Sequence, residues 1–74
     1  MRKRILITGG TGFIGSAIAK LIALENDVVI VDNNQRGFSR RLNIIKNKID
    51  FKNFDVRDEK KLIKASKGAD SIIH

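Results

Sequence analysis

The sequence predicts an α/β fold whose elements follow the order β-α-β-α-β-α-β. Two observations support this class: apolar runs alternate with amphipathic runs along all 74 residues, and a glycine-rich segment separates the first apolar run from the first amphipathic run. Continuous apolar runs are typical of parallel strands covered on both faces, and amphipathic runs are typical of helices. Because crossovers between parallel strands are almost always right-handed, we expect the strand order 3-2-1-4, which is one half of a doubly wound parallel sheet.

The first half of the chain predicts two strands with a helix between them. Residues 5–7 form a short apolar run that suits a covered strand. Residues 13–26 carry apolar side chains at helical spacing, which predicts one apolar helix face. The expected members of that face are Ile14, Ala17, Ile18, Leu21 and Ile22. Residues 28–31 are a β-branched run that ends at Asp32 and predicts the second strand.

The second half predicts two further helices, each followed by a strand. Residues 39–48 suit a short helix that carries three apolar side chains, Leu42, Ile44 and Ile45. Residues 49–56 suit a third strand with four apolar members, Ile49, Phe51, Phe54 and Val56. Asp58 is a residue type that caps the start of a helix, and Gly68 is a residue type that follows the end of one. Residues 71–74 then begin a fourth strand.

The strongly basic composition, a net charge of +7, permits two interpretations. One is binding to nucleic acid or to a membrane surface. The other is a solvated lysine-rich surface, part of which serves a phosphate-bearing ligand. The chain has four Phe and neither Tyr nor Trp. Because stacking platforms for single-stranded nucleic acid need aromatic side chains, we favour the second interpretation.

Compartment and membrane association follow from three further properties of the sequence. The sequence contains no run of about 20 apolar residues, which is the length needed to span a bilayer. The apolar run at residues 5–7 is too short for the core of a secretory signal. The chain has no cysteine, which is compatible with a reducing compartment. We therefore expect a cytoplasmic protein without a membrane partner.

The glycine-rich segment contains two overlapping dinucleotide-binding patterns. Gly10, Gly12 and Gly15 satisfy G-x-G-x-x-G, and Gly9, Gly12 and Gly15 satisfy G-x-x-G-x-x-G. Glycine permits the tight turn, lets the backbone approach a pyrophosphate, and allows the helix to pack closely against the strand. The amides at the start of the following helix then receive the phosphates. The segment predicts the phosphate loop of a Rossmann domain.

Asp32 extends this prediction to the cofactor. It lies 20 residues past Gly12, at the end of the second expected strand, where a carboxylate accepts hydrogen bonds from the adenosine ribose hydroxyls. The same carboxylate would repel a 2′-phosphate, which favours NAD over NADP. The downstream arginines Arg36, Arg40 and Arg41 would favour NADP if they faced the cofactor, and we prefer a surface role for them. The alternative is a tight strand–helix turn without a ligand, in which Asp32 is a solvent-exposed acid at the end of a strand.

Taken together, these residues resemble the extended branch of the short-chain dehydrogenase/reductase superfamily, the NAD-dependent epimerases and dehydratases of sugar nucleotides. Four segments carry the resemblance, which covers essentially the whole chain. They are Ile-Thr-Gly-Gly-Thr-Gly-Phe-Ile-Gly at 7–15, Val-Asp-Asn-Asn at 31–34, Asp-Val-Arg-Asp at 55–58 and Ala-Asp-Ser-Ile-Ile-His at 69–74. The resemblance implies an N-terminal, partial NAD(P)-binding Rossmann domain over residues 1–74, without the catalytic and substrate-binding parts.

The resemblance also implies roles for the phosphate loop. Gly9 and Gly12 would line the pyrophosphate, and Phe13 and Ile14 would supply amides from the start of the helix, with Phe13 also packing near the cofactor.

Further positions are implied for the adenosine part of NAD. Asp32 would accept hydrogen bonds from the ribose, and three residues would lie beside it, Asn33, Asn34 and Gly37. Asp55 would accept a hydrogen bond from the adenine amino group, and Val56 would flank the ring. From the residues alone, Asp55 could equally be an acid that simply precedes a helix cap.

No catalytic residue and no metal site are expected within the chain. The family's catalytic base is the tyrosine of a Tyr-x-x-x-Lys motif, and the chain contains no tyrosine. His74 is the only histidine, and in the family pattern it is a strand residue rather than a proton carrier. We therefore expect the 74 residues to be inactive alone, either as part of a longer enzyme or as a short product that at most binds nucleotide.

Three functional hypotheses follow. The first is the NAD-binding portion of a sugar-nucleotide epimerase or dehydratase, in which hydride passes between a substrate sugar and NAD. The second is a non-catalytic module that binds or senses NAD(H), and the third is a basic nucleic-acid binder on the same scaffold. We also expect self-association, as a homodimer or through open sheet edges, because unpaired edges invite pairing with another copy.

Overall fold

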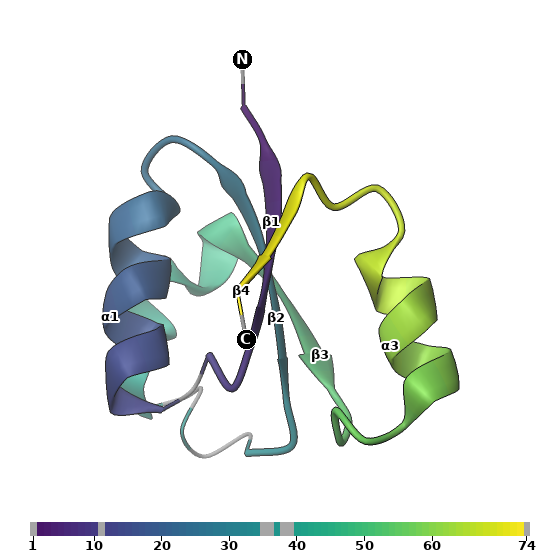
Figure 1. Cartoon of the computed structure of the whole chain (residues 1–74). Helices are drawn as coiled ribbons and strands as arrows, with labels where there is room; N and C mark the ends of the chain where they lie inside the picture. The colour runs from purple at the N-terminus through teal and green to yellow at the C-terminus, as the bar shows by residue number, and fades with distance from the viewer. Residues whose placement is uncertain (1, 11, 35–36, 38–39, 74) are drawn as a thin grey trace.

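A computed structural model describes residues 2–10, 12–34, 37 and 40–73 (Figure 1). The regular elements alternate between strands and helices, as the sequence predicts. In chain order they are β1 (Arg4–Thr8), α1 (Phe13–Ile22), β2 (Asp27–Asp32), η1 (Asn43–Lys48), β3 (Ile49–Asn53), α3 (Glu59–Ser66) and β4 (Ser71–Ile73).

The four strands form one parallel sheet in the order β3-β2-β1-β4, which confirms the expected order 3-2-1-4. Leu6 lies at the centre of the sheet, where it pairs with Val29 on one side and with Ile72 on the other. Figure 1 shows α1 and η1 on one face of the sheet and α3 on the other. The fold is therefore the three-layered half of a doubly wound α/β domain.

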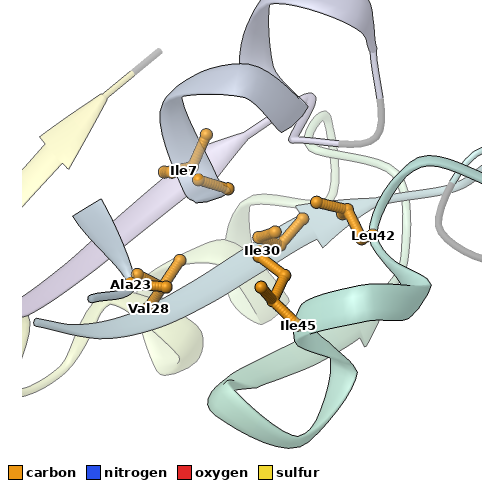
Figure 2. Close-up of a cluster of buried hydrophobic side chains, with 7 residues drawn as sticks. Ile7, Ala23, Val28, Ile30, Leu42 and Ile45 are labelled. Carbon is orange, nitrogen blue, oxygen red and sulfur yellow. The ribbon is translucent and has the colours of Figure 1, made fainter. Parts of the chain in front are cut away.

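The face of the sheet under α1 holds the larger part of the core (Figure 2). Strand residues Ile7, Val28 and Ile30 pack there against the small side chains of Ala19 in α1 and of Ala23, its C-cap. Small side chains allow the helix to lie close to the sheet. Two fully or almost fully buried residues complete the cluster from the following segment, Leu42 and Ile45.

Helix α1 differs from its expected form in the face that it buries. The most deeply buried residues of the helix are Ser16 and Ala19, and Ile18 and Ile22 pack beside them. By contrast, Ile14 is 72% exposed and Leu21 is 71% exposed. The helix is apolar over more of its circumference than the sheet can cover, so spacing alone did not identify the buried face.

The helix is also shorter than the predicted 13–26. It ends at Ile22, whose carbonyl oxygen accepts hydrogen bonds from both the backbone amide and the side-chain amide of Asn26, each at 3.0 Å. Asn26 thus closes the turn that follows the helix, and Asp27 is already the first residue of β2.

Two later elements also differ from their expected bounds. The predicted helix at 39–48 is a 3₁₀ helix over Asn43–Lys48, preceded by helical backbone at Arg40 and Arg41, while residue 39 lies outside the described part. Ile44 is 88% exposed, so only Leu42 and Ile45 of the expected apolar trio are buried. The third strand ends at Asn53, and the rest of the predicted 49–56 forms the turn that leads to α3.

Helix α3 covers the opposite face of the sheet, where Leu6, Val29 and Val31 are buried. Its predicted ends are confirmed. The Asp58 carboxylate accepts a hydrogen bond from the Lys61 amide at 3.2 Å, and Gly68 has the positive φ of 81° that favours glycine after a helix. Among the described residues, no helix is both long enough and apolar enough to cross a membrane.

Candidate functional site

The carboxyl ends of β1, β2 and β3 border a pocket of about 330 Å³. Ligands of open α/β sheets bind beyond the carboxyl ends of the strands, beside the point where the strand order reverses. In this sheet that point is β1, which has β2 on one side and β4 on the other. The pocket is lined by Thr8, Gly9, Asp32, Asn33, Phe54, Asp55 and Val56.

Five of the ten residues expected from the sequence thus line one pocket: Gly9, Asp32, Asn33, Asp55 and Val56. Two lining residues, Thr8 and Phe54, were not expected. Thr8 is the last residue of β1, and Phe54 directly follows β3. The position of each at a strand's carboxyl end could have identified them, because that edge of a parallel sheet faces the ligand.

The loop after β2 fixes the position of Asp32. The Asp32 carboxylate accepts a hydrogen bond from the Asn34 amide at 2.9 Å, and the Asn34 side-chain oxygen accepts one from the Gly37 amide at 3.0 Å. Asn34 and the buried Gly37 therefore shape the turn and are not among the residues that line the pocket. Asp32 itself is half-buried at its rim.

Three glycines in the loop and the first turn of α1 are required by the backbone conformation and the packing of the fold. Gly9 has a φ of 70°, and its amide donates to the Val31 carbonyl at 2.9 Å, which joins the loop to β2. A Cβ on Gly10 would lie 2.6 Å from the Ile30 side chain. A Cβ on Gly15 would lie 2.6 Å from the Gly9 carbonyl oxygen. These contacts confirm the expected tight turn and the close packing of the helix, which here meets the loop backbone.

Gly12 is different. Its φ of −70° and ψ of 171° are accessible to any residue, and among the described atoms a Cβ there would meet only the Gly9 carbonyl oxygen, at 3.5 Å. That distance is an ordinary van der Waals contact. The protein therefore has no packing reason for glycine at this position, and the space beside it is open to solvent.

The starts of α1 and α3 differ in how their first amides are satisfied. The first amides of an α-helix have no acceptor within the helix and carry partial positive charge. In α3, Asp58 accepts from one of them and Glu59 adds an acid to the first turn. In α1 the N-cap is Gly12, which has no side chain, and the first turn contains no acid. Phe13 and Ile14, both exposed, thus begin a helix whose positive end receives no hydrogen bond from an N-cap side chain and has no acid in its first turn.

Asp55 carries a fixed negative charge at the pocket. Its carboxylate oxygens accept hydrogen bonds from the Arg57 guanidinium, the shortest at 2.6 Å, and from the Arg57 amide at 2.9 Å. These bonds lower the pKa of the Asp55 carboxyl from 3.8 to about 2. The side chain is 36% exposed, so the ionised group remains accessible from the pocket.

Several other residues considered in the sequence take no part in the described site. Arg36 and His74 lie outside the described residues. Arg40 is exposed and Arg41 is half-buried, and neither lines the pocket. Among residues that the structure describes, no group of three or more His, Cys, Asp or Glu side chains is placed to hold a metal ion.

Comparison with known proteins finds a family and individual relatives that match most of the chain. The model of the NAD dependent epimerase/dehydratase family matches residues 5–74. A UDP-glucose 4-epimerase of Neisseria meningitidis serogroup B is 40% identical over 79 residues, which covers 97% of this chain and 23% of that protein. A putative UDP-glucose 4-epimerase of Methanocaldococcus jannaschii is 48% identical over 56 residues, covering 74% of this chain and 17% of that protein.

The fold likewise has solved relatives. The X-ray structure of Pen from Bacillus thuringiensis superposes with a TM-score of 0.81 at 25% sequence identity, covering 95% of this chain and 22% of that one. The chain thus spans less than a quarter of the length of each of these three proteins.

Proposed function

Since the chain belongs to the NAD dependent epimerase/dehydratase family, we propose that residues 1–74 are a partial NAD-binding domain of an enzyme that acts on a sugar nucleotide. The observation that carries the proposal is the pocket at the carboxyl edge of the sheet. It brings Asp32 and Asp55 together beside the glycine loop, although they are far apart in the sequence.

Gly12 and the start of α1 support binding of the pyrophosphate. The open space at Gly12 has no structural explanation, whereas a phosphate that approaches the backbone would need it. The uncapped positive end of α1 lies directly after it, and the amides of Phe13 and Ile14 are its first donors. An anionic ligand would supply to α1 the hydrogen-bond acceptors and the negative charge that Asp58 and Glu59 supply to the start of α3.

The two carboxylates support binding of the adenosine. Asp32 ends β2 at the rim of the pocket, where its oxygens can accept from ribose hydroxyls, with Asn33 beside it. Its negative charge disfavours the additional phosphate of NADP. Asp55 would accept from the adenine amino group, and the apolar side chains of Val56 and Phe54 would contact the ring. Asn34 and Gly37 would act indirectly, by holding the turn that orients Asp32.

The proposed reaction belongs to the longer enzyme. NAD, when bound, accepts a hydride from a sugar carbon and can return it. The Neisseria relative is a UDP-glucose 4-epimerase, the Methanocaldococcus relative is described as a putative one, and a further relative from Bacillus cytotoxicus is a UDP-N-acetyl-alpha-D-glucosaminuronate decarboxylase. We therefore propose a UDP-sugar as the substrate class. The residues of this chain would bind and orient the cofactor.

Binding of NAD to the intact protein tests the proposal. NAD should raise the melting temperature of the wild type, because a ligand that binds only the folded state stabilises it. Asp32→Asn should weaken NAD binding about tenfold, or about 1.4 kcal/mol, and relax the rejection of NADP. Asp27→Asn, at the opposite end of β2, removes the same charge and should leave both properties unchanged. If NAD fails to stabilise the wild type, or if the two variants behave alike, the proposed site is wrong.

A further inference from the structure

A second pocket, of about 340 Å³, lies on the α3 side of the sheet. Its lining is strongly basic and contains no acidic residue. The lining residues are Arg4, Lys52, Phe54, Lys61, Lys64, Ala65 and Lys67. We call this the basic pocket. It shares only Phe54 with the pocket at the carboxyl edge of the sheet, so the two ligand spaces are distinct.

The topology brings these cations together from three elements. Arg4 begins β1 and Lys52 lies on β3, on either side of β2. Lys61 and Lys64 are three residues apart on α3, so they lie on one side of the helix, and Lys67 is its C-cap. Five positive groups from positions up to 63 residues apart thus converge on one hollow.

Nearby carboxylates compensate only part of this charge. Asp50 lies 3.8 Å from Arg4 and 3.4 Å from Lys52, and Asp58 lies 4.0 Å from Lys61. Neither Lys64 nor Lys67 forms an ion pair with any described residue. The basic pocket therefore keeps a surplus of positive charge that a bound anion would neutralise.

The shape of the basic pocket favours a small ligand over a polymer. A volume of about 340 Å³ is at the lower end of the range for small-molecule sites. Among the described residues that line it, Phe54 alone is aromatic, whereas a strand of nucleic acid needs successive stacking platforms. Lysine binds phosphate as a point charge, and several lysines around one hollow suit an anion with several charges in a small volume.

We propose that the basic pocket binds a compact anion that carries two or more linked phosphate groups. The charged phosphates would lie against Lys64 and Lys67, and Phe54 and Ala65 would provide an apolar wall. This inference does not depend on the cofactor proposal, because neither lysine lines the other pocket.

Titration of the intact protein with inorganic tripolyphosphate, followed by calorimetry and by amide chemical shifts, tests the proposal. The double variant Lys64→Gln/Lys67→Gln should bind tripolyphosphate about tenfold more weakly, since it loses two charged contacts. The control Lys20→Gln/Lys46→Gln removes the same total charge from exposed positions on α1 and η1. Its affinity should change by less than about twofold. The wild-type shifts should centre on the Lys64 and Lys67 amides.

Three results would overturn the proposal. Equal losses in the two double variants would mean that only net charge attracts the anion. Shifts confined to Gly9, Gly12 and Phe13 would place the phosphates at the glycine loop instead. Tighter binding of a single-stranded oligonucleotide than of tripolyphosphate, lost in Lys64→Gln/Lys67→Gln, would identify a nucleic acid as the partner.

Discussion

Asp55 and Arg57 show how one side chain sets the charge of a neighbour in the pocket at the carboxyl edge of the sheet. The guanidinium hydrogen-bonds to the carboxylate and holds the pKa of Asp55 near 2. A carboxyl group whose pKa is lowered by folding stabilises the fold above its ordinary pKa of 3.8 and loses that contribution as the pH falls through about 2. The pair therefore adds no pH dependence to the free energy of unfolding near neutrality, where the Asp55 carboxyl is ionised.

Arg57→Gln tests this account. Without the guanidinium, the pKa of Asp55 should rise from about 2 toward 3.8, measured by the carboxyl carbon shift of Asp55 during an acid titration. Lys60→Gln removes a neighbouring positive charge that makes no ion pair with a described residue, and it should leave the Asp55 pKa near 2. An unchanged Asp55 pKa in Arg57→Gln would show that the hydrogen bonds from the guanidinium do not keep the Asp55 carboxyl ionised.

At the scale of elements, the junction of the glycine loop and α1 separates structural glycines from one that the fold does not require. Gly15→Ala would place a Cβ 2.6 Å from the Gly9 carbonyl oxygen, a backbone atom that cannot move independently of the loop. We expect the free energy of unfolding to fall by about 2 kcal/mol. Gly12→Ala should change it by less than about 0.5 kcal/mol, because the site is open. Urea denaturation measures both.

The affinity for NAD provides a second test of Gly12→Ala. Gly12→Ala, although stable, should bind NAD about tenfold more weakly, or about 1.4 kcal/mol, because its methyl group would occupy the space proposed for the pyrophosphate. A Gly12→Ala protein with wild-type affinity would contradict that placement.

The elements also show which features the sequence could predict. Type, order and pairing of the strands were predictable, because apolar runs and a glycine loop restrict the topology strongly. The buried face of α1 was not, because Ile14 and Leu21 extend its apolar surface beyond the core. The end of β3 was missed for a related reason: Phe54 and Val56 are apolar and pack on the core, but their backbone has already left the sheet.

The candidate site divides in the same way. Asp32 could be placed at the edge of the sheet from its spacing after the glycine loop and its position at a strand end, whereas Asp55 could be placed only through the family resemblance. Thr8 and Phe54 were not selected, although Thr8 belongs to the glycine-rich segment and each residue lies at the carboxyl end of a strand. The basic pocket could not be predicted, because Lys61, Lys64 and Lys67 follow a regular spacing but Arg4 and Lys52 reach them only through the fold of β1 and β3.

At the scale of the whole molecule, exposed apolar surface is expected to drive association of the 74 residues when they are expressed alone. Leu21 and Leu24 lie on or directly after α1, and both are more than half exposed, as is Ile72 on β4. Apolar patches of this kind and unpaired sheet edges promote contacts between copies. Light scattering should show species larger than a monomer, and Leu21→Lys/Leu24→Lys should reduce their proportion.

A control variant keeps this expectation specific. Lys20→Gln changes the same helix without removing apolar surface, and it should associate as the wild type does. A monodisperse wild-type monomer that unfolds cooperatively in a calorimeter would contradict the prediction.

The position of β1 has a consequence for synthesis. β1 lies at the centre of the sheet, and one of its two partners is β4, with the Arg4 amide bonded to the Asp70 carboxylate 66 positions later. β1 and β2 can pair early, but the other edge of β1 cannot pair until β4 has been synthesised. Contacts between such distant positions slow folding, because a long loop must close before they form. The nascent chain therefore exposes an apolar strand edge of β1 until β4 has been synthesised, and chaperones can protect that edge during this interval.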